Sequence, residues 1–496
     1  MMKLIFSSPW VCRLGVALCV APAISTAAAS SGPSAWVLER VTVVDVKTGN
    51  LSPGMSLLIE GGKIARIASA ASIARGSDIV RVDGAGRFVV PGYLDMHAHP
   101  LNAPDPRPSL KLMLSNGITG YRQMSGSPEL LRARQEKKLE FDDSPALLAM
   151  PGTILTDALA PTPDAARGQV KKQKADGADF IKTVGLSSAN FYAAGAEAQA
   201  QGLPYVGHMN MDVDVRQAAR VMRSIEHLGP MEVMLLGCSS EEPAIRDGMA
   251  HAHVEPPQIG PPSTPQAQAA IARMIANPAM NVKPHQFANM RRVIDSFDAT
   301  RCGELARELI KDGAWQAPTL IRLRTMELAD DPAYRGDANL RFMPVPVQQM
   351  WRELSAQFGQ RISQVDRDTY RRFFALQLRF VKLLQDSGVP LLAGSDAGGS
   401  IWVVPGFSLH QEFDLLEAAG LTPLQVLQSA TINGARFLGR EAHLGSVEAG
   451  RTADLVLLDD NPLGSVANLH RIAGVVRSGH YYDAPALHRL QATALP

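Results

Sequence analysis

The chain has 496 residues, of which 46% are hydrophobic and 20% are charged, and its formal net charge is +1. This composition is that of an ordinary globular protein, and the length allows one large barrel with a smaller domain, or two to three separate domains. Because neither sign of charge is in excess, the sequence lacks the basic footprint of a nucleic-acid-binding protein.

The first 29 residues have the pattern of a secretory signal peptide. Lys3 and Arg13 are its only charged residues, an apolar run follows over 14–22, and Ala27-Ala28-Ala29 fits a cleavage site of small residues. A membrane anchor is the alternative, but the apolar run is too short to span a bilayer comfortably. We therefore expect residues 1–29 to be removed and the mature protein to be secreted into a periplasm, without a stable membrane anchor.

Two of the four cysteines lie in this first segment, which leaves Cys238 and Cys302 in the mature chain. Neither belongs to a C-x-x-C motif or to a cluster of cysteine and histidine, so we expect both to be structural. A disulfide bond between them and two buried thiols are both compatible with the sequence.

Short strands with tight turns are predicted near both ends of the chain. The strand-like runs are apolar or β-branched and lie between glycine and proline turns, at residues 36–45, 56–60, 63–67, 453–459 and 472–479. We expect residues 30–90 and 441–496 to pair with each other and to form one small β-sandwich.

Between these ends, residues 91–440 alternate between strand-like and helical segments. Several short apolar runs end near a polar residue, at 117–122, 178–184, 203–208 and 390–396. Repeated strand–helix units predict a parallel sheet, and in a closed (β/α)8 barrel these polar residues would lie at the catalytic end. Residues 238–385 do not fit the alternation, and we interpret them as insertions over the barrel mouth.

Residues 89–100, Val-Val-Pro-Gly-Tyr-Leu-Asp-Met-His-Ala-His-Pro, place two histidines at the end of an apolar run. Because side chains alternate along a strand, His97 and His99 point the same way and can bind one divalent metal ion. The pattern alone is weak, since His251-Ala-His253 repeats it without a preceding strand. Four further candidates each end a strand-like run, and the whole set predicts a metallohydrolase; they are Lys182, His208, His227 and Asp396.

These motifs together resemble the amidohydrolase superfamily. The segments that carry the resemblance follow the family order and lie at 91–99, 180–184, 206–208, 224–227, 394–398, 421–435 and 445–456. The nearest subgroup is the imidazolonepropionase-like group, which includes metal-dependent dipeptidases and carboxypeptidases. The resemblance runs from residue 36 to about residue 485 and matches 238–385 poorly. It implies an α/β fold, a (β/α)8 TIM barrel with a small composite β-sandwich built from both chain ends.

The resemblance also implies a centre with two divalent metal ions. His97, His99 and Asp396 would bind one ion, and His208 and His227 would bind the second. Zinc suits these ligands, as do cobalt, manganese and iron.

Lys182 would bridge both ions after carboxylation by CO2, since a lysine ammonium has no lone pair with which to bind a cation. The alternative is an ordinary lysine at a strand end, with its ammonium reaching solvent. Asp396 would also act as the general base, whereas a turn or helix N-cap is the alternative for this residue.

Such a centre implies an amidohydrolase that cleaves a small-molecule amide through a metal-bridged hydroxide, in a dipeptide, an N-acyl amino acid or a related conjugate. A lactonase, an esterase or a cyclic-amide hydrolase would use the same centre. A mononuclear deaminase would lack the bridging lysine, and a non-catalytic scaffold would have lost ligands.

The candidates for substrate binding are Arg122, Tyr205 and His410, with Arg322 as a further one. Arg122 ends a strand-like run and could hold a substrate carboxylate, but a structural ion pair inside the barrel is an equal alternative. The sequence leaves a homo-oligomer open.

Overall fold

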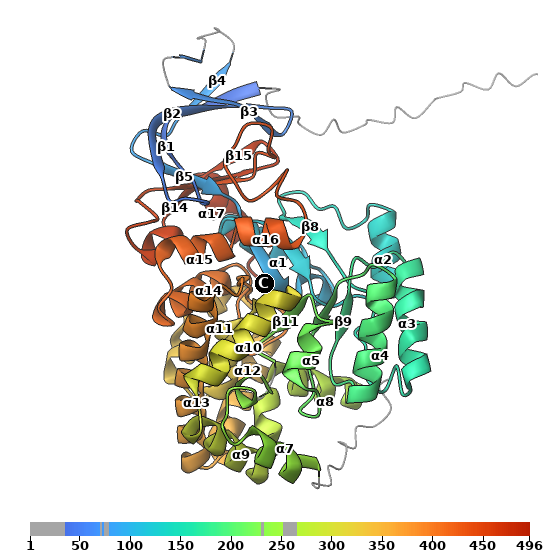
Figure 1. Ribbon diagram of the computed structural model, residues 1–496. Coiled ribbons are helices and arrows are strands. Elements are labelled where there is room, and N and C mark those ends of the chain that lie inside the picture. Colours follow the sequence, from blue (N-terminus) through green and yellow to red (C-terminus); the bar gives the residue numbers. More distant parts are fainter. Residues whose placement is uncertain (1–34, 70–71, 74–78, 230–232, 251–264) are drawn as a thin grey trace, which may run out of the picture. The chain divides into compact units, whose positions relative to one another are not determined.

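The computed structural model describes residues 35–69, 72–73, 79–229, 233–250 and 265–496 (Figure 1). The predicted signal peptide at residues 1–29 and the His251-Ala-His253 sequence lie outside these ranges. Among the described residues, no helix combines the length and the apolar composition needed to cross a bilayer.

Strands from the two ends of the chain pair in one sheet. They are β1 (Ala35–Val44), β2 (Leu51–Glu60), β3 (Lys63–Ser69), β4 (Val80–Asp83), β5 (Phe88–Pro91), β13 (Leu455–Leu458), β14 (Ile472–Arg477) and β15 (His480–Asp483). Within the described residues they form an eight-stranded sheet in the order β15-β14-β13-β5-β1-β2-β3, with β4 paired to β1. The ends meet where β13 runs antiparallel to β5, with Leu455 opposite Pro91. The predicted pairing of the two chain ends is thus observed, and the β-sandwich stays a prediction.

The apolar side chains of this sheet share one core. Trp36 and Val41 of β1 are buried together with Val89 of β5 and Leu455 of β13. The indole Nε1 of Trp36 also donates a hydrogen bond to the carbonyl oxygen of Gly479 at 2.8 Å. Since buried apolar surface contributes about 25 cal/mol per Å², this shared core holds the two ends of the described chain together.

The strands of the middle region are parallel. They are β6 (Tyr93–Ala98), β7 (Ile118–Gln123), β8 (Ala146–Ala149), β9 (Ile181–Thr183), β10 (Tyr205–Gly207), β11 (Ser224–Glu226) and β12 (Trp315–Ala317). Among the described residues they form two sheets, β6-β7-β8 and β12-β11-β10-β9. Isolated parallel bridges lie at the edges of these two sheets. Pro151, after β8, pairs with Phe180, before β9. Residues 391–397 make the other two bridges, Leu391 with Gln316 of β12 and Ala397 with Ala98 of β6. The carboxyl ends of all these strands therefore lie on the same side.

Most of these strands are followed by a helix. The helices are α1 (Arg107–Ser115), α2 (Pro128–Gln135), α3 (Pro163–Ala175), α4 (Ser188–Ala200) and α5 (Val215–Ala219). Local sequence determines where several of them begin: the side chains of Ser127, Thr162 and Asp214 accept hydrogen bonds from backbone N–H groups of the first turn. Helices α3 and α4 pack side by side (Figure 1).

Residues 238–385 are largely helical, but they also contain β12. From residue 233 to the end of the chain, the described α-helices are α6 (Val233–Leu236), α7 (Glu242–Ala250), α8 (Pro265–Ala276), α9 (Pro284–Asp295), α10 (Ala299–Asp312), α11 (Leu320–Glu327), α12 (Val345–Arg361), α13 (Gln364–Ser387), α14 (Phe407–Ala418), α15 (Pro423–Ser429), α16 (Ile432–Phe437) and α17 (Ala484–Thr493). Short 3-10 helices lie at Pro100–Asn102, Pro278–Asn281, Pro332–Gly336, Ala338–Phe342 and Val466–His470. The region predicted as an insertion therefore also supplies one strand–helix unit, β12 and α11, to the parallel sheet.

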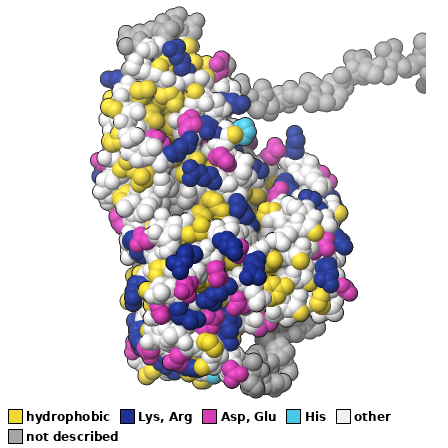
Figure 2. Space-filling view, in the orientation of Figure 1, with side chains coloured by type: hydrophobic (Ala, Val, Ile, Leu, Met, Phe, Trp, Pro, Cys, Tyr) yellow, Lys and Arg dark blue, Asp and Glu magenta, His cyan; other side chains and the backbone are white. Residues whose placement is uncertain are grey.

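The surface agrees with the near-neutral composition. Figure 2 shows Lys and Arg side chains interspersed with Asp and Glu over the helical part of the face in view, while hydrophobic side chains gather near the β1–β3 sheet. Mixed charges of this kind are expected from a formal net charge of +1.

Cys238 and Cys302 form a disulfide bond, which answers the question that the sequence leaves open. Both cysteines are buried, and the bond connects the segment after α6 to helix α10. A disulfide of this kind persists in oxidising compartments.

Reduction of this disulfide should lower the free energy of unfolding by about 2–4 kcal/mol, because the bond restricts the unfolded chain. Urea denaturation with and without a reductant measures the change. The Cys238→Ser/Cys302→Ser variant is the control, since the reductant should not affect it. An identical unfolding midpoint for reduced and oxidised wild-type protein would contradict a stabilising bond.

Candidate metal centre

His97, His99 and Asp396 lie together at the carboxyl ends of the parallel strands. Ligand atoms of the three side chains are all within 4.8 Å of one another, and all three side chains are buried. The Nε2 atoms of His97 and His99 are 3.3 and 3.1 Å from Oδ1 of Asp396. The i, i+2 spacing therefore places both imidazoles on one side, as the sequence predicts, and 391–397 brings the carboxylate to them.

His208 and His227 extend this group. The ring of His227 lies 4.5 Å from that of His97 and 4.8 Å from that of His208, measured between centroids. His208 follows β10 and His227 follows β11, so each histidine occupies the end of a different strand. The four histidines thus form one continuous cluster with Asp396.

Positive backbone φ angles occur at several of these strand ends. The values are 56° at His227, 56° at Asp396 and 44° at Thr319. Residues other than glycine rarely adopt this conformation, which costs of order 1–3 kcal/mol and concentrates at functional sites. The backbone conformation therefore lowers the free energy of unfolding at the positions where the side chains converge.

Lys182 is buried on β9, with 2% of its surface exposed. Its Nζ has no hydrogen-bond partner within the described residues. Burial lowers the pKa of this amine to about 8. Burial lowers the pKa of both His99 and His208, and the charge of Lys182 lowers each of them further, so the amine lies near both histidines.

The unpartnered atoms fit a centre for divalent cations. Nε2 of His97, like Nζ of Lys182, is buried without a hydrogen bond among the described residues. An unsatisfied buried polar group costs about 1–3 kcal/mol. A bound cation would satisfy Nε2 of His97, whereas Nζ of Lys182 could face a cation only after losing its proton or being carboxylated. Burial also lowers the pKa of His208 and His227 well below the usual value. Both imidazoles are therefore neutral and keep the lone pair that metal binding requires.

The outward-facing nitrogens of three histidines have polar partners. Nδ1 of His97 lies 2.7 Å from Oε2 of Glu226, and Nδ1 of His99 lies 3.0 Å from Oγ of Ser125. Nδ1 of His227 contacts Oγ1 of Thr319. These contacts orient the rings so that each Nε2 faces the cluster. Sequence reasoning missed all three partners, and the only signal for them was a charged Glu226 within a buried strand.

Arg122 contacts one of these partners, Glu226. Its Nη2 donates to Oε1 of Glu226 at 2.9 Å, its Nη1 to Oγ of Ser224 at 3.2 Å, and its Nε to the carbonyl oxygen of Met96 at 2.6 Å. Burial alone would raise the pKa of Glu226, but the charge of Arg122 and the hydrogen bond with His97 outweigh it and lower this pKa. Arg122 thus forms a structural ion pair between β7 and β11, which was the alternative to substrate binding.

The other candidates for substrate binding lie in different places. Tyr205 begins β10 and packs against Phe191 of α4, with ring centroids 5.2 Å apart. His410 of α14 has its Nε2 2.9 Å from the carbonyl oxygen of Asn116, away from the histidine cluster. Arg322 of α11, in contrast, donates from Nη1 to the carboxylate of Asp396 and to the carbonyl oxygen of Gly399 at 2.9 Å. Of these residues, Arg322 alone contacts the cluster.

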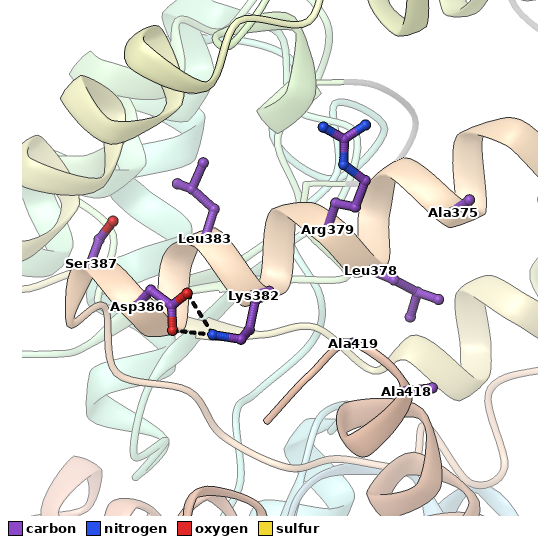
Figure 3. Close-up of a pocket in the computed structure, with 9 residues that line it drawn as sticks. All are labelled: Ala375, Leu378, Arg379, Lys382, Leu383, Asp386, Ser387, Ala418 and Ala419. Atoms are coloured by element: carbon purple, nitrogen blue, oxygen red, sulfur yellow. Dashed lines mark hydrogen bonds and ion pairs between the residues drawn. The ribbon is translucent and has the colours of Figure 1, made fainter. Parts of the chain in front are cut away.

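A surface groove of about 720 Å³ lies apart from this centre (Figure 3). Leu378, Leu383 and other residues of α13 line it together with Ala418 and Ala419. Its lysine and aspartate, Lys382 and Asp386, pair with each other along the helix. None of the cluster residues lines the groove, so we assign it no catalytic role.

The sequence of residues 377–481 matches a family model described as the amidohydrolase family. An adenine deaminase from Rubrobacter xylanophilus is 37% identical over 67 residues, which are 14% of this chain and 11% of that protein. An imidazolonepropionase from Shouchella clausii is 54% identical over 79 residues, which are 15% of this chain and 16% of that protein. The chain therefore matches only a small part of the length of either relative.

Solved structures resemble the chain over most of its length. A bottromycin amidohydrolase aligns with a TM-score of 0.67 and 22% identity, covering 94% of this chain and 91% of that chain. A Xaa-Pro dipeptidase with bound methionine in the active site aligns with a TM-score of 0.57 and 18% identity, covering 91% and 100%. The protein shares the α/β fold of these structures, and the amidohydrolase family match lies within its residues 377–481.

Proposed function

We propose that this protein is a metal-dependent hydrolase that cleaves an amide bond with a centre of two divalent metal ions. The observation that carries the proposal is the convergence of four histidines with the buried side chains of Lys182 and Asp396 at the carboxyl ends of parallel strands. The amidohydrolase family domain supports a hydrolase that acts on C–N bonds.

The proposed scaffold is a (β/α)8 barrel, with residues 391–397 as its eighth strand. The parallel bridges between Gln316 and Leu391 and between Ala98 and Ala397 support this closure. The eight-stranded sheet would be the small second domain, in the form of a β-sandwich. In such barrels the active site lies at the carboxyl ends of the strands.

His97, His99 and Asp396 would hold one ion, His208 and His227 the other, and Lys182 would bind both. Zinc is the ion that we propose, since it accepts nitrogen and oxygen ligands. When bound, the ions would supply Lewis-acid activation of water and of the substrate carbonyl.

Lys182 would act as a carbamate. Its neutral amine attacks the carbon of CO2, forms an N–C bond and releases one proton, which leaves an anionic carboxylate on Nζ. The burial of Lys182 and the absence of a partner for Nζ among the described residues support this role, because an unmodified ammonium cannot bind a cation.

Asp396 would accept a proton from the attacking water and deliver it to the leaving amine. Burial by itself would raise the pKa of Asp396, but the charge of Arg322 and the neighbouring imidazoles of His97 and His99 lower it well below the usual value. Asp396 is therefore ionised at neutral pH and available as an acceptor.

The protein would act on small amides outside the cytoplasm, with a dipeptide, an N-acyl amino acid or a related conjugate as substrate. The disulfide between Cys238 and Cys302 supports export to an oxidising compartment. Lactone hydrolysis by the same centre is a second candidate function. A deaminase is a third, since an adenine deaminase shares a short similar stretch with this chain.

The purified mature protein should contain close to two metal ions per chain by plasma mass spectrometry. Removal of the metal with a chelator should lower the rate of amide hydrolysis by about 100-fold or more, and zinc with bicarbonate should restore it. Assays on matched amides and lactones, with ammonia release from adenine as a third arm, separate the three activities. Full turnover of the metal-free protein would contradict the proposal.

Lys182→Ala should lower amide hydrolysis by about 100-fold, because the ligand common to both ions is lost. A short carboxylic acid such as acetate should restore part of the rate by taking the place of the carbamate. Lys174→Ala removes an exposed lysine of α3 and serves as the matched control, with unchanged rate. Wild-type activity of Lys182→Ala without any additive would exclude the carbamate role.

A further inference from the structure

The histidines of the centre have unequal partners. Nδ1 of His97 faces a carboxylate oxygen of Glu226 at 2.7 Å, whereas Nδ1 of His99 faces the hydroxyl of Ser125 at 3.0 Å. His227 also faces a hydroxyl, that of Thr319. One imidazole therefore has an anionic partner, and two have neutral ones.

Glu226 cannot leave this position without losing several contacts. Its Oε1 accepts hydrogen bonds from Nη2 of Arg122 at 2.9 Å and from Oγ of Ser224 at 2.5 Å, so that Oε2 remains for His97. Glu226 and Arg122 are both fully buried.

Arg122 is itself fixed in place. Its Nε donates to the carbonyl oxygen of Met96, the residue before His97, at 2.6 Å. The guanidinium carbon also lies 4.8 Å from the centre of the Phe437 ring. The carboxylate of Glu226 is therefore anchored to the same strand that carries His97.

A buried ion pair contributes little to stability when compared with apolar residues of the same size, because both charges lose their hydration. A contribution to stability therefore does not explain the Arg122–Glu226 pair, and we look for its role in the contacts that it makes. Within the described part of the chain, the side-chain hydrogen bond that joins this pair to the cluster is the one between Nδ1 of His97 and Oε2 of Glu226.

We propose that Glu226 is a positioning residue that makes the His97–His99–Asp396 position the tighter of the two metal positions and the first to be filled. This inference rests on the proposed function, since it assumes that both positions bind metal. A carboxylate that accepts the Nδ1 proton fixes the tautomer of His97, keeps Nε2 free for the ion and strengthens it as a donor.

The second position lacks such support. His227 has a neutral hydroxyl partner, and the ring of His208 makes no hydrogen bond within the described residues. The first position also has the carboxylate of Asp396 as a direct ligand candidate. Its ligands therefore carry more negative charge, apart from the lysine that both positions would share.

Competition titrations of the metal-free, full mature protein with zinc and a chromophoric chelator test this inference. Wild-type protein should show two binding steps of different affinity. Glu226→Gln keeps the shape of the side chain but removes its charge, and should weaken the tighter step by about 10–100-fold while leaving the weaker step unchanged. Glu226→Asp, which keeps the charge, should recover part of this loss.

Ser125→Ala is the matched control, because it removes a neutral partner from the other histidine of the same position. It should weaken the tighter step by less than Glu226→Gln does. Two unchanged steps in Glu226→Gln would overturn the inference and leave the two-ion centre intact. A wild-type protein that binds no zinc would overturn the proposed function itself.

A measurement on unmodified protein keeps the inference testable if Glu226→Gln fails to fold. Nitrogen NMR of the histidine rings in metal-free wild-type protein should show His97 protonated at Nδ1 and unprotonated at Nε2. Protonation of His97 at Nε2 instead would contradict the role of Glu226.

Discussion

The structure depends on a set of buried polar groups that the protein alone does not satisfy. Nε2 of His97 and Nζ of Lys182 are both without hydrogen bonds among the described residues, and both side chains are buried. Such groups destabilise the fold by about 1–3 kcal/mol each, and the left-handed backbone at His227 and Asp396 adds further strain. These costs are understandable if the cluster exists to bind cations.

The remainder of the fold holds these side chains in position relative to one another. Parallel strands bring their carboxyl ends to one side, so residues far apart in sequence meet there without any long loop having to position them. The Arg122–Glu226 pair and the hydroxyls of Ser125 and Thr319 then fix the rings from behind. The composite sheet does not contribute a ligand, but it connects β5, which leads directly into the strand of His97 and His99, to the C-terminal strands.

Sequence reasoning anticipated the cluster because each candidate ends a short apolar run. This pattern can be recognised in the sequence without knowledge of tertiary contacts. It could not anticipate Glu226 or Thr319, since a partner to a histidine is defined by contacts across strands. It left Arg122 undecided between substrate and ion pair, because the opposing charge lies 104 positions away in the sequence. Residues 238–385 were the least predictable, and β12 within them is too short to stand out among helices.

The central claim is that two cations occupy one centre, and anomalous diffraction from crystals of the zinc-loaded protein tests it most directly. Two anomalous peaks at the zinc edge are expected, about 3.5–4 Å apart, one among His97, His99 and Asp396 and the other between His208 and His227. Continuous density from Nζ of Lys182 to both peaks would complete the centre. A single peak, with an unmodified Lys182, would contradict the account.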